Sequence, residues 1–431
     1  MKANLAFGKG FLTVDLPDRF RCLTLDARSA RPLVNVNEEL HRALETPIAS
    51  PALEDVARGK KSAAISVCDI TRPAPNSQTL PPLLHRLEQA GIPRHAITIL
   101  IATGLHRAAT ESEIREICGP EVASQYKVVN HNARDLASHR HIGTTTAGTP
   151  IYIDERFISA DLHITLGLIE PHLMAGFSGG RKLVAPGLAA QETIKVLHSP
   201  KFMRAPRSAE GFIEDNPLHR ELLEIARIAR HDFLLDVALT REREIAGIFA
   251  GNPVEAHLTG AEFVTRVMLE QLDEALDGVI TSAAGYPLDL TFYQAIKGIT
   301  GASHIVKPGG QILLIAECEE GAGAPEFQEM LRSYPSHREF MNKILHAPVT
   351  VDQWQLEKLA LVTADRGVSF FVPGLPTEYW ANLWGPAFQS LTAALNAFFA
   401  GMPEGAIIGV IPDGPYVLAK TMSQNISLGR Q

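Results

Sequence analysis

Residues 161–187, DLHITLGLIEPHLMAGFSGGRKLVAPG, decide the expected fold. The segment opens with a short apolar run, His163–Leu168, that does not alternate strictly with polar residues. Such a run is typical of a strand covered on both faces. A glycine-rich loop follows and leads into two adjacent cations, Arg181 and Lys182. A buried strand that runs directly into a polar loop indicates an α/β protein.

Outward from this segment, similar apolar runs alternate with helix-like stretches. The expected strands are 63–70, 97–102, 163–168, 233–239, 278–282, 311–316, 359–363 and 407–411. The expected helices include 81–90, 110–117, 217–229 and 388–399. The alternation predicts an α/β fold of two domains, each with a largely parallel sheet flanked by helices, and an active site in the cleft between the domains.

A boundary between these domains is expected where a helical pattern over residues 253–276 ends before a new strand. We expect an N-terminal α/β domain over 1–270 and a C-terminal α/β domain over 271–431, whose last helix packs back on the first domain. A length of 431 residues agrees with two or three domains.

Composition narrows the possible partners and the compartment. The net charge is −8, from 40 basic and 48 acidic residues without a long block of one sign, which argues against nucleic acid or an anionic membrane as partner. No apolar run approaches the roughly 18 residues of a membrane span, and the first residues do not resemble a signal peptide. Four widely spaced cysteines without a CxxC pair indicate a reducing cytoplasm.

The first polar cluster is DITRP at 69–73, which follows an expected strand. Asp69 and Arg72, with Thr71 between them, could hold a ligand hydroxyl and a carboxylate or phosphate, because the arginine fork suits planar anions. A turn with a surface ion pair explains the motif equally well.

The second cluster, TGLHR at 103–107, also follows an expected strand. His106 there could act as an acid or base near neutral pH. Taken singly, a histidine in such a loop is more often a solvated side chain.

The third cluster, 170–187, is the densest, and it contains His172 as well as the two cations. Its small residues would let backbone amides approach an anion, so a phosphate cradle is plausible. The spacing matches neither a P-loop nor a dinucleotide fingerprint. A purely structural loop is the less favoured alternative, since two cations, a histidine and four glycines are hard to explain by packing.

His198 lies sixteen residues beyond Lys182, in the sequence HSP. Imidazole is a common ligand for nickel, zinc and copper, but no second histidine stands at HxxH or HxxxH spacing. From the residues alone, a histidine without a metal is the more probable interpretation.

The fourth cluster, GYPLD followed by YQAIKG, spans 285–298 at the start of the second domain. If residues 291–297 are helical, Tyr293 and Lys297 share one face, and with Gln294 they could bind a carboxylate. A capped surface helix is the favoured alternative when the cluster is taken alone.

The ordered set of clusters resembles the nickel-dependent lactate racemase family, whose members are racemases and epimerases of 2-hydroxy acids. The resemblance runs through both expected domains and is most specific at SGGRK. It is carried by DITRP at 69–73, TGLHR at 103–107, EPHLMAGFSGGRK at 170–182, HSP at 198–200 and GYPLD…YQAIKG at 285–298.

The resemblance implies a nickel-pincer nucleotide, a pyridinium-3-thioamide-5-thiocarboxylic acid mononucleotide of Ni(II). Lys182 would form its thioamide and His198 would be the protein ligand to nickel. His106 and His172 would be the paired acid–base residues. The cofactor would also contact Thr71 and the loop residues Ser178, Gly179, Gly180 and Arg181. Asp69, Arg72, Tyr293, Gln294 and Lys297 would orient substrate and catalytic groups. No role is assigned to Trp380 or Trp384.

The chemistry agrees with this assignment. The Cα proton of a 2-hydroxy carboxylate is very weakly acidic, and hydride transfer avoids the carbanion. One histidine takes the hydroxyl proton as hydride leaves, and hydride return to the other face of the 2-keto acid inverts the centre. Lys182 must be partly deprotonated to attack a thioacid, and burial beside Arg181 would lower its pKa.

Within the resemblance, lactate is the default substrate, and malate, an aryl-lactate or a sugar acid are alternatives. Enzymes that make the cofactor would be transient partners. Two hypotheses from other classes remain: a nucleotide-dependent transferase that uses residues 179–182 on a phosphate, and a nucleotide-binding module without catalysis.

Overall fold

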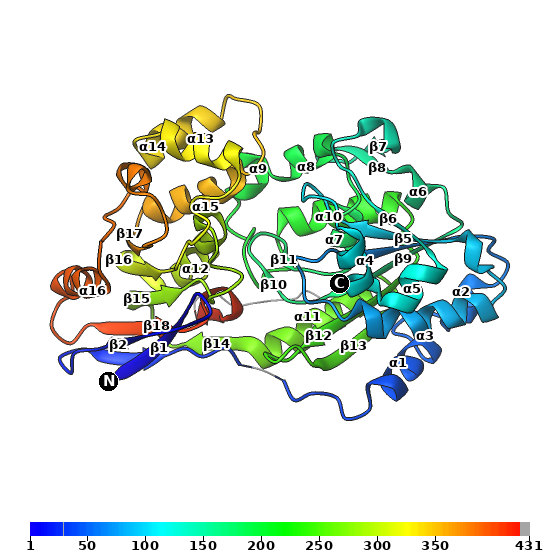
Figure 1. The fold of residues 1–431 in the computed structure, drawn as a ribbon, viewed down its shortest axis with the longest axis horizontal. Helices are drawn as coiled ribbons and strands as arrows, with labels where there is room; N and C mark the ends of the chain where they lie inside the picture. Colours follow the sequence, from blue (N-terminus) through cyan, green and yellow to red (C-terminus); the bar gives the residue numbers. More distant parts are fainter. Residues whose placement is uncertain (29, 423–431) are drawn as a thin grey trace. The chain divides into compact units, whose positions relative to one another are not determined.

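The computed structural model describes residues 1–28 and 30–422, which fold as two compact units (Figure 1). One unit contains 30–197 and Pro206–Val267. The other contains Met1–Arg28, His198–Ala205 and the described residues from Met268 onward. Each unit is therefore assembled from more than one segment. The end of the chain, 423–431, lies outside the described residues. The expected packing of the last helix on the first domain stays a prediction.

The unit of residues 30–197 and 206–267 is built on a six-stranded sheet, parallel except for its β12–β13 edge. In sheet order the strands are β13 (Ile245–Gly251), β12 (Phe233–Leu239), β9 (Leu162–Leu168), β4 (Ala63–Cys68), β5 (Ile97–Ala102) and β6 (Lys127–Asn130). Every residue of β4 and β9 is buried, because both faces of the sheet are covered.

Helices and two short hairpins complete this unit. The helices are α1 (Val36–Glu45), α2 (Leu53–Ala57), α3 (Asn76–Gln89), α4 (Glu111–Cys118), α5 (Pro120–Gln125), α6 (Glu155–Ile158), α7 (Arg181–Val184), α8 (Gln191–Leu197), α10 (Pro217–Ile228) and α11 (Glu255–Met268). The hairpins are β7 (His139–Thr144) with β8 (Pro150–Asp154), and β10 (Pro171–His172) with β11 (Gly176–Phe177).

The second unit is built on a five-stranded parallel sheet. In sheet order its strands are β17 (Gly367–Phe371), β16 (Val306–Ile315), β15 (Leu276–Ser282), β18 (Ile407–Ile411) and β3 (Arg21–Thr24). The antiparallel pair β1 (Lys2–Phe7) and β2 (Gly10–Asp15) and the parallel pair β14 (Leu269–Leu272) and β19 (Leu418–Thr421) lie outside this sheet. The helices are α9 (Pro200–Met203), α12 (Phe292–Ser303), α13 (Pro325–Ser333), α14 (His337–Ile344), α15 (Gln353–Thr363) and α16 (Leu391–Ala400).

The expected α/β class with largely parallel sheets is confirmed. One strand prediction is wrong, because residues 359–363 form the second half of α15. Almost every residue of α15 is buried, so its sequence lacks the polar face that marks a surface helix. A short apolar run of this kind cannot be distinguished from a buried strand by periodicity alone.

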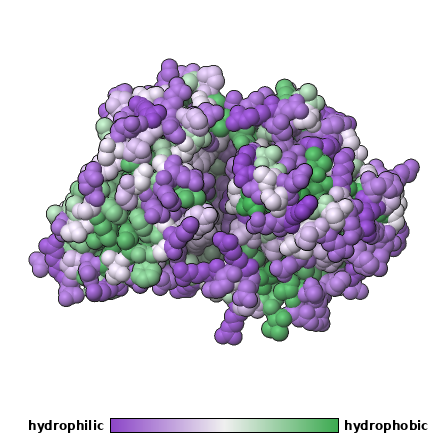
Figure 2. All heavy atoms as spheres, viewed as in Figure 1, coloured by the Kyte–Doolittle hydropathy of each residue, from purple (hydrophilic) through white to green (hydrophobic). Residues whose placement is uncertain are grey.

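The surface of the chain is mostly polar. Figure 2 shows hydrophilic residues over most of the visible face, with a more hydrophobic area over α16. None of the helices in the described part of the chain is long and apolar enough to cross a bilayer.

Candidate active site

Three of the predicted clusters follow neighbouring parallel strands of one sheet. β4 lies between β5 and β9, and the sequence after these strands carries DITRP, TGLHR and EPHLMAGFSGGRK. The carboxyl ends of parallel strands meet at one edge of a sheet, where α/β proteins bind ligands. This topology brings clusters that are far apart in sequence to the same edge.

His106 is oriented by Asp69. Its Nδ1 lies 2.7 Å from Oδ2 of Asp69, and the Thr71 hydroxyl donates to Oδ1 of the same carboxylate at 2.6 Å. Burial raises the pKa of Asp69, but the hydrogen bond and charge of His106, the Thr71 hydroxyl and Arg72 outweigh it and leave this pKa below its usual range. An ionised Asp69 accepts the Nδ1–H of His106, so Nε2 keeps a lone pair and can act as a base.

His172, on β10, is held in the opposite tautomer. Its Nδ1 accepts the backbone N–H groups of Met174 at 3.3 Å and Ala175 at 3.2 Å. The proton of the neutral ring must therefore be on Nε2, which lies 3.0 Å from Nζ of Lys182. The hydrogen-bond network thus makes His172 a donor at Nε2 where His106 is an acceptor.

Lys182 sits on the short helix α7 and is tied to the loop of His106. The amide of Gly187 donates to the Lys182 carbonyl at 3.0 Å, and the amide of Gly104 donates to the Gly187 carbonyl at 3.0 Å. Burial, then Arg72 and Arg181, lower the pKa of Lys182 to about 7, while Glu170 opposes them. A substantial fraction of this amine is neutral at physiological pH.

The turn before Lys182 requires glycine. Gly179 has φ +77° and Gly180 has φ +47°, values that L side chains rarely adopt. A Cβ on Gly179 would lie 2.3 Å from Oδ2 of Asp236, a buried carboxyl on β12 whose pKa burial raises to about 7. The Ser178 hydroxyl donates to the Leu168 carbonyl at 2.6 Å and fastens the loop to the end of β9. The loop therefore packs directly on the sheet.

Arg181 is buried and supports the same loop from within. Its guanidinium donates to the carbonyls of Ala175 at 2.8 Å and Phe177 at 3.1 Å, and it contacts Nε2 of His257. Burial lowers the pKa of Arg181 to about 9. These contacts show Arg181 holding the backbone of the β10–β11 hairpin, and its predicted contact with a cofactor stays a prediction.

Arg72 pairs with a carboxylate that we did not predict. Its Nη1 lies 2.9 Å from Oε1 of Glu170, in the loop after β9. The only sequence signal for Glu170 was its place two residues before His172. The pair links the first cluster to the third.

The remaining predicted residues lie in the other unit. The ring centroids of His198 and Trp354 are 4.4 Å apart, and Nε1 of Trp354 donates to the Tyr293 hydroxyl at 3.2 Å. Tyr293, Gln294 and Lys297 lie on α12, which confirms the expected helix. Trp354, on α15, had no sequence signal. Oε1 of Gln294 is buried and has no hydrogen-bond partner among the described residues.

Trp380 and Trp384 have structural contacts. Nε1 of Trp380 donates to the Leu375 carbonyl at 3.2 Å, and Nε1 of Trp384 donates to the Tyr334 carbonyl at 2.9 Å. Both rings also pack against the apolar core of their unit. They anchor loops in that unit.

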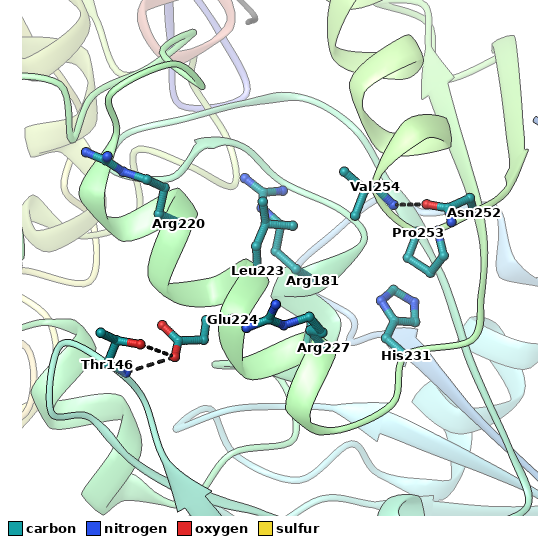
Figure 3. Close-up of a pocket in the computed structure, with 11 residues that line it drawn as sticks. Thr146, Arg181, Arg220, Leu223, Glu224, Arg227, His231, Asn252, Pro253 and Val254 are labelled. Atoms are coloured by element: carbon teal, nitrogen blue, oxygen red, sulfur yellow. Dashed lines mark hydrogen bonds between the residues drawn. The ribbon is translucent and has the colours of Figure 1, made fainter. Parts of the chain in front are cut away.

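A cavity of about 420 Å³ lies beside α10, and Figure 3 shows the residues that line it. Its lining includes Arg181, Arg220, Glu224, Arg227 and His231. Glu224 is held by the backbone and hydroxyl of Thr146, as the dashed lines in Figure 3 show. Of the predicted site residues, only Arg181 lines this cavity.

Comparison with known proteins identifies the family. The model of the lactate racemase N-terminal domain matches residues 7–211, and that of the C-terminal domain matches residues 272–419. The chain belongs to the lactate racemase family. Racemases are isomerases, so this family member is an enzyme of that class, as expected.

Two relatives named lactate racemase match this chain over nearly its full length. The one from Thermoanaerobacterium thermosaccharolyticum is 35% identical, and the one from Lactiplantibacillus plantarum is 32% identical. Each alignment covers 97% of this chain and 99% of the relative.

Solved structures give the same result for the fold. The lactate racemase apoprotein of T. thermosaccharolyticum matches with a TM-score of 0.91 at 34% identity, over 97% of this chain and 100% of that one. A protein from Thermotoga maritima matches with a TM-score of 0.67 at 17% identity, over 91% of this chain and 99% of that one. At that identity the second match concerns the fold alone.

Proposed function

We propose that the chain interconverts the two enantiomers of lactate, using a nickel-pincer nucleotide attached covalently to Lys182. The observation that carries the proposal is the pair of histidines held in opposite tautomers, His106 by Asp69 and His172 by backbone amides. The pair presents one nitrogen that can take the proton of a substrate hydroxyl and one N–H that can donate a hydrogen bond to a substrate oxygen, as a racemase with two histidines requires. Membership of the lactate racemase family supports lactate as the substrate.

The residues present fit the implied cofactor. The amine of Lys182 has a pKa lowered to about 7, as attack on an acyl carbon requires. Among the described residues, no group of three or more His, Cys, Asp and Glu could hold a metal. A single protein ligand, His198, suits a nickel ion whose other ligands belong to an organic group. When bound, that group supplies the hydride acceptor and donor that the protein lacks.

The chain's own residues would carry the proton steps. Nε2 of His106 accepts the proton of the substrate hydroxyl from one enantiomer. His172 serves the oxygen on the opposite side: its Nε2–H donates a hydrogen bond in the neutral ring, and it acts as an acid once Nδ1 has taken up a second proton. Each proton transfer contributes on the order of 10²–10⁴-fold to the rate. Arg72 would hold the substrate carboxylate, so that the planar keto acid turns without leaving.

Other residues would bind and orient. Tyr293, Gln294 and Lys297 would contact substrate and cofactor, and the buried Oε1 of Gln294 is an acceptor for a ligand donor. Thr71 and the loop of Ser178, Gly179, Gly180 and Arg181 would contact the nucleotide. We place the reaction in the cytoplasm, with the cofactor-making enzymes as transient partners and neither nucleic acid nor membrane involved.

The test is a racemisation assay on protein co-expressed with the cofactor-making enzymes. L-lactate and D-lactate are incubated separately and the enantiomer ratio is followed by chiral chromatography. Malate, phenyl-lactate and gluconate extend the panel to a second carboxylate, an aryl group and a sugar acid. We expect both lactate reactions to approach a 1:1 mixture. Preference for another substrate would change the substrate that we assign but not the reaction class. If the loaded protein turned over none of these 2-hydroxy acids, the proposal would be overturned.

A further inference from the structure

The side chains of His172 and Lys182 are hydrogen-bonded to each other in the chain without a cofactor. Nε2 of His172 lies 3.0 Å from Nζ of Lys182, while Nδ1 accepts the amides of Met174 and Ala175 at 3.3 and 3.2 Å. An imidazole that accepts at Nδ1 carries its proton on Nε2. The hydrogen bond between the two side chains therefore runs from the ring N–H to the amine.

Only a neutral amine can receive that hydrogen bond, because an ammonium group has three donors and no lone pair. The surroundings favour the same form. Lys182 is enclosed, and Arg72 and Arg181 place two positive charges near it, against one carboxylate from Glu170. The geometry of His172 and the charges around Lys182 thus both favour the neutral form of the amine.

We propose that His172 is the positioning residue that keeps Lys182 neutral for acylation, and that acylation of Lys182 in turn frees Nε2–H of His172 to donate a hydrogen bond to a ligand. In the attachment step, a bond forms from Nζ to an acyl or thioacyl carbon and the bond from that carbon to its leaving group breaks. One amine proton departs with the leaving group, so atoms and charge balance. The second half of the proposal rests on the proposed racemase function.

The release follows from the chemistry of the product. The nitrogen of an amide or thioamide shares its lone pair with the carbonyl or thiocarbonyl group and no longer accepts a hydrogen bond. After acylation, Nε2–H of His172 therefore no longer ends on Lys182 and can be offered to a substrate oxygen. Attachment of the cofactor would make this hydrogen-bond donor available, and an unloaded chain would keep it engaged with Lys182.

The first test measures acylation of Lys182 without any cofactor. The unloaded full-length chain is treated with N-acetoxysuccinimide over a pH series, and labelling of Lys182 is read by peptide mass spectrometry against the exposed Lys127 as internal reference. We expect half-maximal reactivity near pH 7 in the wild type. His172→Phe removes the donor and should shift the midpoint upward by about one pH unit, which lowers reactivity at pH 7 about 5-fold.

The matched variant is His172→Gln, whose side-chain amide can still donate to Lys182. It should recover most of the lost reactivity, a recovery that a general packing role would not predict. Circular dichroism checks that both variants fold. Equal midpoints in the wild type and His172→Phe would overturn the first half of the proposal.

The second test reads the tautomer directly and needs no variant that folds differently. In the ¹⁵N-histidine-labelled unloaded chain, we expect His172 to carry its proton on Nε2. Acetylation of Lys182 should shift the Nε2 resonance while Nδ1 stays an acceptor. A proton on Nδ1 or an unchanged Nε2 signal after acetylation would contradict the proposal. Neither readout uses lactate or nickel, so a chain that failed as a racemase could still pass both tests.

Discussion

Nδ1 of His106 lies 2.7 Å from Oδ2 of Asp69, and this contact determines which nitrogen of His106 can take a proton. In Asp69→Asn, the side chain can present an N–H instead of an oxygen, which favours the other tautomer and blocks Nε2. We expect the racemisation rate of the loaded enzyme to fall on the order of 10²-fold or more, from both enantiomers.

The control for this variant is Thr71→Val, which removes one hydrogen bond to the same carboxylate and leaves its charge. It should cost much less than Asp69→Asn. Equal losses in the two variants, measured as kcat with each enantiomer, would show that the loop and not the tautomer matters.

The second prediction concerns the effect of Lys182 on how the free energy of unfolding depends on pH. Its folded pKa of about 7 lies below the ordinary value of 10.5, so between these values the unfolded chain binds the extra proton and the free energy of unfolding rises with pH. Lys182→Met lacks this group. The variant should be more stable than the wild type at pH 7, and the difference should shrink by about 2 kcal/mol at pH 9.

Urea unfolding at both pH values gives these differences. The buried carboxyl of Asp236 titrates in the same region, but it is present in both proteins and cancels in the difference. The exposed Lys127→Met serves as control and should show no pH-dependent difference. A stability difference for Lys182→Met that is the same at pH 7 and pH 9 would refute a charged-form penalty at this site.

A third prediction distinguishes the proposed role of His198, which is to bind nickel, from that of Lys182, which is to tether the cofactor. In His198→Ala, the one proposed protein ligand is gone while Lys182 is intact. Removing a residue that only hydrogen-bonds to a metal ligand lowers the affinity for the metal about 10–100-fold. Removing the ligand itself should therefore lower the amount of nickel bound per chain at least about 10-fold. Intact mass should still show an adduct on Lys182.

Elemental analysis measures the nickel, and the exposed His41→Ala is the matched control. Nickel retained in His198→Ala would assign the ligand elsewhere. Trp354→Phe keeps a ring beside His198 but removes the N–H that reaches Tyr293, and it should lose less nickel than His198→Ala.

The strand ends could be predicted from sequence because they depend on local pattern. Buried runs of Ile, Val and Leu mark β4, β5 and β9, and polar motifs follow each of them. Once the strands are parallel neighbours, their loops must meet at one edge. This is why the clusters of Asp69 and His106 were recognised before their contact was known.

The partners of these residues could not be predicted, because they come from distant or featureless positions. Trp354 reaches His198 from a helix whose sequence resembles a strand, and Asp236 lies under Gly179 as one carboxyl within an apolar strand. Glu170 was visible only as part of a motif. Such contacts depend on which elements pack together, and no periodicity encodes them.

The last prediction concerns Gly179, where both the backbone conformation and the nearby side chain of Asp236 exclude a side chain. Its φ is +77°, and an added Cβ would lie 2.3 Å from Oδ2 of Asp236. Gly59 has the same φ of +77° with no atom within 4 Å of such a Cβ. Gly59→Ala should therefore cost about 1 kcal/mol for backbone strain alone, and Gly179→Ala should cost about 1–3 kcal/mol more, because the loop must move off β12.

A shift of the Gly179 loop would displace α7, which carries Lys182, because the backbone amide of Lys182 donates to the Gly179 carbonyl at 3.1 Å. We therefore expect Gly179→Ala to lose the cofactor adduct as well as stability, whereas Gly59→Ala keeps the adduct. Chemical denaturation and intact mass after co-expression measure the two effects. Equal stability losses with full loading in both variants would mean that the close approach to Asp236 does not set the position of Lys182.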